Sequence, residues 1–228
     1  MKRREGDLSQ VFHALATGAH RLRQTASLQP SSKFLARALV KKLPLEDAKC
    51  VIALGPGLQE VTRLVLARLP PDAHVHAIEA DDSPAFVRGG RLDDPRLRPL
   101  HGTAAEAASL LRHDGCLVGT DAIISSMRLS TMPSASREEV LGAASDVLKP
   151  GGRFVQVQYA HARAISFQPG EGLGPFDGEE FLSRWFHDVE ARFVALNLPP
   201  AFVYTCKRAR AIAVAPRRMT HWRLAGAR

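Results

Sequence analysis

A glycine-rich turn, Gly55-Pro56-Gly57, follows the apolar run VIAL and precedes a helical pattern that begins near Gln59. Glycine lets the backbone approach a ligand without a Cβ clash, and the first N–H groups of the following helix have no partner within that helix. Further along, Glu79 ends a second apolar run, HVHAIE. A carboxylate at this spacing can accept hydrogen bonds from both ribose hydroxyls of an adenosyl group. The two features predict a site for a nucleotide-like cofactor.

Short apolar runs alternate with helical segments from residue 44 onward. The strands and helices that they predict must position the glycine-rich turn and Glu79. We predict strands over residues 49–54, 74–79, 96–102, 121–126 and 153–160. We predict helices between them over residues 59–68, 84–88, 104–111 and 137–148. Alternation at this spacing indicates parallel strands joined by right-handed crossovers. In such a sheet the ligand binds outside the carboxyl ends of the strands, where the turn and Glu79 both lie.

The alternation of predicted strands and helices ends after residue 160. Residues 175–188 have a helical pattern, and two β-rich runs follow over 189–198 and 202–209, joined by Pro-Pro-Ala. These runs predict a closing antiparallel pair. The expected fold is therefore α/β and Rossmann-like, with a mostly parallel seven-stranded sheet, an antiparallel closing strand and helices on both faces.

Two helices are expected before the first strand. Apolar residues recur at helical spacing from Leu8 to Leu22 among basic residues, which predicts an amphipathic helix. A second helix begins at Pro30 with Ser31 or Ser32. We expect an N-terminal helical segment over 1–43, the main domain over 44–210 and a basic tail over 211–228.

Composition excludes several classes of protein. The chain has 228 residues, of which 45% are hydrophobic and 24% charged, as in ordinary globular proteins. The formal net charge of +8 favours anionic partners such as phospholipid headgroups or nucleic acid. Cys50, Cys116 and Cys206 are odd in number and far apart, so we expect reduced thiols in a cytosolic protein and no metal site. No run of about 18 apolar residues is present.

Several short motifs together resemble one family. They are LQPSSKFLARAL before the first strand, LGPG in the turn, AIE on the second strand, LKPGGRFVQVQY along the fifth and NLPPAFVY at the closing hairpin. In this order they resemble the class I S-adenosylmethionine-dependent methyltransferases. More narrowly, the chain is similar to the bacterial phospholipid N-methyltransferases of the soluble type, which methylate phosphatidylethanolamine, and to related lipid N-methyltransferases.

This resemblance implies roles for particular residues. The Gly55-Pro56-Gly57 turn would hold the methionine part of the cofactor, Glu79 the ribose, and Thr103 with Ala104 the adenine. The segment SSMRL would lie where methyl transfer occurs, with Arg128 gripping a lipid phosphate. The implied cofactor-binding residues are Gly55, Pro56, Gly57, Glu79, Ala80, Thr103, Ala104 and Ser125, and the implied catalytic residues are Ser126, Arg128 and Tyr159. The Tyr159 ring could stabilise a methylated ammonium group by cation–π attraction.

The sequence departs from the family pattern around the turn. Ala53 replaces a glutamate, Leu58-Gln59 replaces Thr-Gly, and Thr103 replaces an aspartate. A charge-assisted hydrogen bond is worth roughly 1.5 to 3 kcal/mol. Together these changes predict an affinity for S-adenosylmethionine that is lower by about two decades.

Three hypotheses for function follow. The leading one is an N-methyltransferase that acts on a lipid headgroup amine, or on a small amine, at the inner face of the membrane, bound there through its basic N-terminal helix. An alternative is a catalytically silent relative that binds a membrane or a partner. A nucleic-acid methyltransferase is less favoured, because SSMRL lacks the Asn/Asp-Pro-Pro-aromatic motif that positions a flipped adenine.

Overall fold

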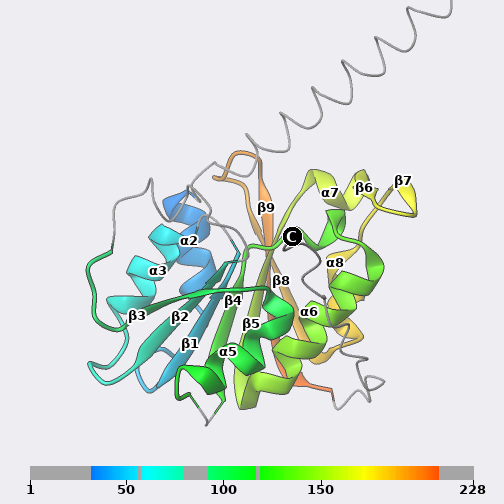
Figure 1. Cartoon of the computed structure of the whole chain (residues 1–228). Coiled ribbons are helices and arrows are strands. Elements are labelled where there is room, and N and C mark those ends of the chain that lie inside the picture. Colours follow the sequence, from blue (N-terminus) through cyan, green and yellow to red (C-terminus); the bar gives the residue numbers. More distant parts are fainter. Residues whose placement is uncertain (1–31, 56–57, 80–91, 117–118, 211–228) are drawn as a thin grey trace, which may run out of the picture.

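A seven-stranded sheet forms the centre of the protein. The computed structural model describes residues 32–55, 58–79, 92–116 and 119–210 (Figure 1). The strand order is β3-β2-β1-β4-β5-β9-β8. The strands are β1 (Cys50–Leu54), β2 (His74–Glu79), β3 (Leu97–His101), β4 (Thr120–Ser125), β5 (Leu148–Tyr159), β8 (Phe186–Val194) and β9 (Ala201–Ala209). Strands β1 to β5 are parallel, which confirms the predicted crossovers.

The closing pair is antiparallel as predicted, but its two strands are not arranged in chain order. Strand β9 pairs with β5 on one side and with β8 on the other, both antiparallel. The antiparallel strand therefore lies inside the sheet, and β8 forms the edge. The sequences explain this order, because β9 begins with the apolar run AFVY, whereas β8 (FHDVEARFV) carries charged side chains at Asp188, Glu190 and Arg192. The strand with more apolar surface takes the interior position.

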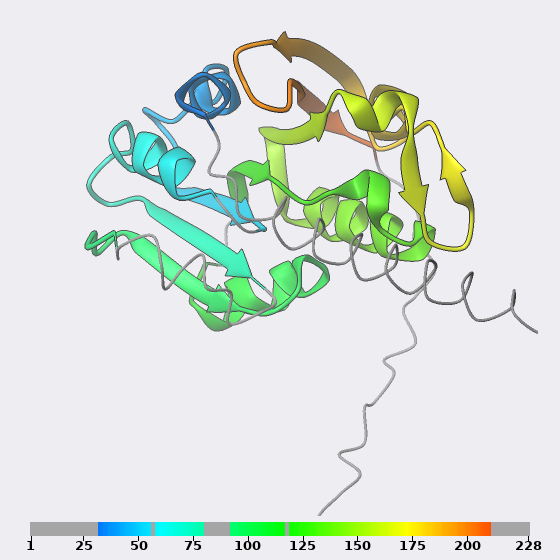
Figure 2. The ribbon, with the colours of Figure 1, turned by 90° about the horizontal axis from the view of Figure 1, so that it is seen from above.

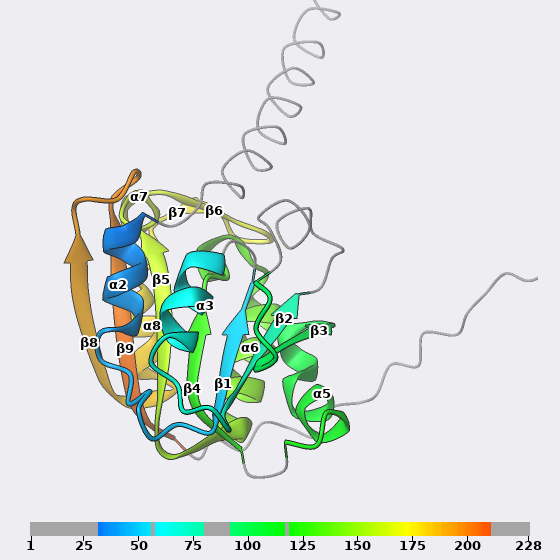
Figure 3. The same ribbon diagram turned by 90° about the vertical axis from the view of Figure 1, so that its left-hand side faces the viewer.

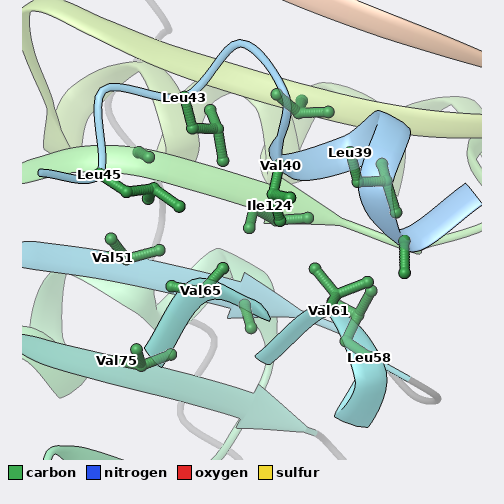
Figure 4. Packing of buried hydrophobic residues seen from close by; sticks show 14 of the residues in the cluster. Leu39, Val40, Leu43, Leu45, Val51, Leu58, Val61, Val65, Val75 and Ile124 are labelled. Atoms are coloured by element: carbon green, nitrogen blue, oxygen red, sulfur yellow. The ribbon is translucent and has the colours of Figure 1, made fainter. Parts of the chain in front are cut away.

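Helices cover both faces of the sheet, as predicted. On one face, α2 (Lys33–Val40) and α3 (Gln59–Leu66) pack against Val51 and Ala53 of β1 (Figures 3 and 4). On the other face, α5 (Ala107–His113), α6 (Ser134–Val147) and α8 (Gly178–Ser183) pack against Ile52 and Leu54. Figure 2 shows the blue and cyan helices and the green helices on opposite sides of the strands. Alternate residues of β1 thus belong to two separate hydrophobic clusters.

The segment after β5 contains elements that the sequence did not predict. Helix α7 (His161–Ala164) leads into a two-stranded ribbon of β6 (Ser166–Gln168) and β7 (Gly172–Gly174). The helix expected over 175–188 is much shorter, since α8 begins after its N-cap Asp177 and ends at Ser183. Trp185 and Phe186 are buried where β8 begins. Their burial in the core favours the extended conformation over the local helical pattern.

Other expected elements lie outside the described residues. These are the helices over 8–22 and 84–88 and the tail over 211–228. None of the described helices is both long and apolar enough to cross a membrane.

Ser32 begins helix α2 and fastens it to the sheet. Its Oγ accepts a hydrogen bond from Leu35 N at 3.2 Å and donates one to Leu196 O at 3.1 Å, in the connection between β8 and β9. Asn197 Oδ1 accepts from Ser32 N at 3.2 Å. The choice of Ser32 as a possible helix start is therefore confirmed.

We expect Ser32→Ala to lower the free energy of unfolding by about 1 kcal/mol, because the helix loses its N-cap. The melting temperature should then fall by roughly 2–4 °C in thermal denaturation. Ser183→Ala is the matched control and should cause no such fall. Ser183 is exposed at the end of α8, and its Oγ donates only to Glu179 O of the same helix, a bond that adds little to helix stability. An equal fall in both variants would contradict the role of the cap.

Candidate active site

The carboxyl ends of β1 and β4 touch each other at Gly55. This residue has a φ of +89°, which strains any residue with a side chain. A Cβ at Gly55 would lie 3.0 Å from Ser126 Oγ and 3.2 Å from Met127 Cγ. Glycine is therefore required here both by the turn and by the close approach of the segment after β4. Pro56, Gly57 and Ala80, which we predicted to bind cofactor, lie outside the described residues.

Glu79 ends β2 with an unsatisfied acceptor. Its Oε2 atom is buried and has no hydrogen-bond partner among the described residues. Burial raises the pKa of this carboxyl group. A buried acceptor without a donor costs free energy, so its presence at the predicted ribose position points to a ligand that supplies the donor.

Thr103 and Ala104 follow β3, and both are engaged within the protein. Thr103 N and Thr103 Oγ1 each donate to Glu106 Oε2 at 2.8 Å, which starts the 3-10 helix η1 (Ala104–Glu106). The same two hydrogen bonds lower the pKa of Glu106. Ala104 is buried in the hydrophobic cluster beneath α5 and α6. The Thr103 side chain thus caps a helix, and its predicted contact with adenine stays a prediction.

The two serines after β4 fix the course of the chain. Ser125 is buried, and its Oγ accepts from Met127 N at 3.3 Å. Ser126 N and Ser126 Oγ both approach Leu54 O, at 3.0 and 3.3 Å. These bonds direct the chain across the end of β1 and into the 3-10 helix η2 (Leu129–Thr131).

A cavity of about 310 Å³ opens beside this segment. It lies between η2, the end of β5, α7 and the β6–β7 ribbon. Ser126, Arg128 and Tyr159 all line it, so the structure brings the three predicted catalytic residues to one cavity. His161 stacks on the Tyr159 ring, with 5.9 Å between the ring centroids. Further lining residues are Leu129, Gln156, Gln158, Ile165, Phe167 and Phe176.

Two glutamines in this cavity were missed by the sequence analysis. Gln156 and Gln158 are only 2% and 7% exposed. Gln156 Nε2 donates to Met127 O at 2.7 Å and to Val157 O at 2.6 Å, and Gln158 Nε2 donates to Phe176 O at 2.7 Å. The Oε1 atom of each is buried without a partner among the described residues. Alternation in RFVQVQY places both on the same face of β5 as Phe154, but only tertiary structure shows that this face is buried.

Comparison with known proteins agrees with this geometry. No family model matches the chain. It is 27% identical over 183 residues to an ornithine lipid N-methyltransferase of Singulisphaera acidiphila, covering 80% of this chain and 88% of that protein. The crystal structure of the Burkholderia thailandensis 1,6-didemethyltoxoflavin-N1-methyltransferase, with S-adenosylhomocysteine bound, superposes with a TM-score of 0.59 at 16% identity, covering 92% of each chain. The chain has the class I S-adenosylmethionine-dependent methyltransferase fold. The Geobacter metallireducens precorrin-6y C5,15-methyltransferase superposes with a TM-score of 0.55 at 16% identity, over 79% of this chain and 94% of that one.

The residues described at this crevice fit S-adenosylmethionine. Glu79 offers an unsatisfied buried acceptor, and Gly55 keeps the turn free of a side chain. Leu58, which we expected to face the cofactor, is instead buried among the residues of α2 and α3, beside Val61 in Figure 4. Ala53 packs in the same cluster. The expectation that the Leu58 side chain faces the cofactor was therefore wrong, whereas the lower affinity expected from all the changes together stays a prediction.

In the part of the chain that the structure describes, no group of three or more histidine, cysteine, aspartate or glutamate side chains could hold a metal ion.

Proposed function

We propose that this protein transfers a methyl group from S-adenosylmethionine to the amine of a membrane-lipid headgroup. The observation that carries the proposal is the cavity next to the cofactor turn, which Ser126, Tyr159 and the two buried glutamines Gln156 and Gln158 line. The ornithine lipid N-methyltransferase relative supports a lipid amine as the acceptor. The acceptors that we propose are phosphatidylethanolamine and an amino-acid-containing lipid such as ornithine lipid.

The cavity suits a neutral amine. When bound, S-adenosylmethionine supplies an electrophilic methyl group, and the amine must approach it with its lone pair unprotonated. Amide oxygens accept the N–H bonds of an amine, whereas a nearby carboxylate would stabilise the charged ammonium form. None of the described residues that line the cavity is an aspartate or a glutamate. Gln156 and Gln158 would therefore orient the amine and leave it reactive, while Tyr159 would face the methylated product.

The surface around the cavity favours a lipid over a soluble amine. Large hydrophobic side chains are exposed at the carboxyl end of the sheet, and we call this set the apolar edge. Its members are Phe34, Ile165, Phe167, Leu173, Phe193, Leu196 and Leu198. Figure 3 shows α7, β6 and β7 at the end of the molecule toward which β1 and β8 point. Ile165 and Phe167 also line the cavity, so the cavity borders this edge.

Exposed apolar patches mark surfaces that bind a membrane or a partner. We propose that the apolar edge rests on the bilayer at the inner face of the membrane, together with the basic segment before Gln24. That segment lies outside the described residues. The hypothesis of a nucleic-acid methyltransferase is supported only by the formal net charge of +8.

The test is methyl transfer from labelled S-adenosylmethionine to vesicles. Vesicles containing phosphatidylethanolamine, ornithine lipid or neither should be compared with phosphoethanolamine and free ornithine in solution. We expect label in the lipid fraction of one or both amine-containing vesicles and little in the soluble amines. If calorimetry shows cofactor binding but no amine lipid is methylated, the proposed substrate class is wrong. If the cofactor does not bind, the catalytically silent alternative is correct.

A further inference from the structure

Two cysteines far apart in the sequence meet at the end of the sheet opposite to the active site. Cys50 is the first residue of β1, and Cys116 follows α5. Their Sγ atoms lie 3.1 Å apart, and both thiols are free. Cys50 is buried and Cys116 is half-buried, so solvent reaches the pair from the side of Cys116. The methyl-transfer chemistry uses neither residue.

A histidine and an aspartate complete this cluster. His76 Nε2 lies 2.9 Å from Asp114 Oδ2, and His76 Nδ1 lies 3.6 Å from Cys50 Sγ. An ionised carboxylate only accepts hydrogen bonds, so Nε2 carries the ring proton and Nδ1 faces the thiol as an acceptor. Burial lowers the pKa of His76, which keeps the ring neutral although Asp114 opposes this effect. Nδ1 is thus placed to take the proton of Cys50.

We propose that Cys50 and Cys116 form a reversible disulfide bond when hydrogen peroxide reaches the Cys116 thiol. This site is independent of the proposed substrate. The loop that the bond would close contains α3, β2, β3 and η1, and it therefore includes Gly55, Glu79 and Thr103. Oxidation would restrain the half of the protein that is expected to hold the cofactor.

The reaction takes place in two balanced steps. In the first, the Cys116 thiol gives its proton to water while its sulfur attacks one peroxide oxygen. The O–O bond breaks, the product is a sulfenic acid, and the departing hydroxide takes up a proton to form water. In the second, Cys50 gives its proton to His76 Nδ1, and its sulfur attacks the Cys116 sulfur. The S–O bond breaks, and the departing hydroxide takes the proton from His76 to form water. The sulfur atoms approach each other by about 1 Å to reach disulfide distance.

The test is thiol titration and peptide mapping of the full-length protein after peroxide treatment. We expect the free thiols to fall from three to one per chain, with Cys206 still reduced, and to return to three with dithiothreitol. The melting temperature of the oxidised protein should rise by roughly 5–10 °C. Cys206→Ser is the matched control and should still form the disulfide. Cys50→Ser and Cys116→Ser should not.

The histidine role has its own readout. In His76→Gln, or in Asp114→Asn if the first variant does not fold, we expect Cys116 sulfenic acid to accumulate and to be trapped by dimedone. Disulfide formation should slow by roughly 100-fold, which is typical for loss of a general base. Loss of Cys206 at the same rate as the pair, or a folded wild-type protein that keeps three free thiols, would overturn the proposal. Unchanged rates of disulfide formation in both variants would show that His76 is not the base that takes the Cys50 proton.

Discussion

Replacing Glu79 by glutamine should weaken S-adenosylmethionine binding by about 10- to 100-fold and, without cofactor, raise the melting temperature. The first effect follows because hydrogen bonds to a charged acceptor are worth roughly 1.5–3 kcal/mol, more than those to a neutral amide. The second follows because Oε2 of Glu79 is buried without a partner among the described residues and the pKa of the carboxyl group is raised. The protein keeps an unfavourable buried charge that a ligand would satisfy.

The pH dependence provides a second test of Glu79. A carboxyl group whose pKa is raised on folding binds its proton more tightly in the folded state, so it lowers stability as pH rises through this raised pKa. The advantage of Glu79→Gln in melting temperature should therefore vanish in acid, below the unfolded pKa of about 4.3. Cofactor affinity of the wild type should fall as pH drops through the raised pKa, and the variant should lack this dependence.

Calorimetry and thermal denaturation would measure both effects. Asp146→Asn, at an exposed position of α6, is the matched control and should change neither affinity nor its pH dependence. An unchanged affinity in Glu79→Gln would show that this residue does not contact the cofactor, and the orphaned oxygen would then need another partner.

Leu173→Asp combined with Leu198→Asp should reduce binding to anionic vesicles by about 100-fold or more. The two side chains are 72% and 82% exposed and belong to the apolar edge. Burying a leucine side chain contributes about 1.5–3 kcal/mol, and each aspartate also adds repulsion from anionic lipid. Leu173 lies in the β6–β7 ribbon and Leu198 in the connection between β8 and β9, so the fold should tolerate both substitutions.

Vesicle flotation of the full-length protein would measure the loss. The control is Ala67→Asp with Ser109→Asp, which adds the same charge at two exposed positions away from the apolar edge, the C-cap of α3 and the middle of α5. Deleting the residues before Gln24 separates the contribution of the N-terminal segment. If the edge variant binds vesicles as the wild type does, the apolar edge does not contact the bilayer. That outcome would not bear on whether the protein binds the cofactor.

The sequence by itself determined the local features of the fold. The short apolar run HVHAIE and the helical pattern after Gln59 predict β2 and α3, and the structure confirms both elements. The turn at Gly55, the cap at Ser32 and the position of Glu79 also depend on neighbours within a few residues. Such features are readable because the backbone geometry that they satisfy is local.

Only the tertiary structure decided which distant residues meet. It placed β9 between β5 and β8, buried Gln156 and Gln158, turned Leu58 into the core and brought Cys50 to Cys116. Periodicity assigns a residue to one face of its own element but does not say which neighbours cover that face. That is settled by long-range strand pairing and by the competition among apolar segments for burial, to which residues from the whole chain contribute.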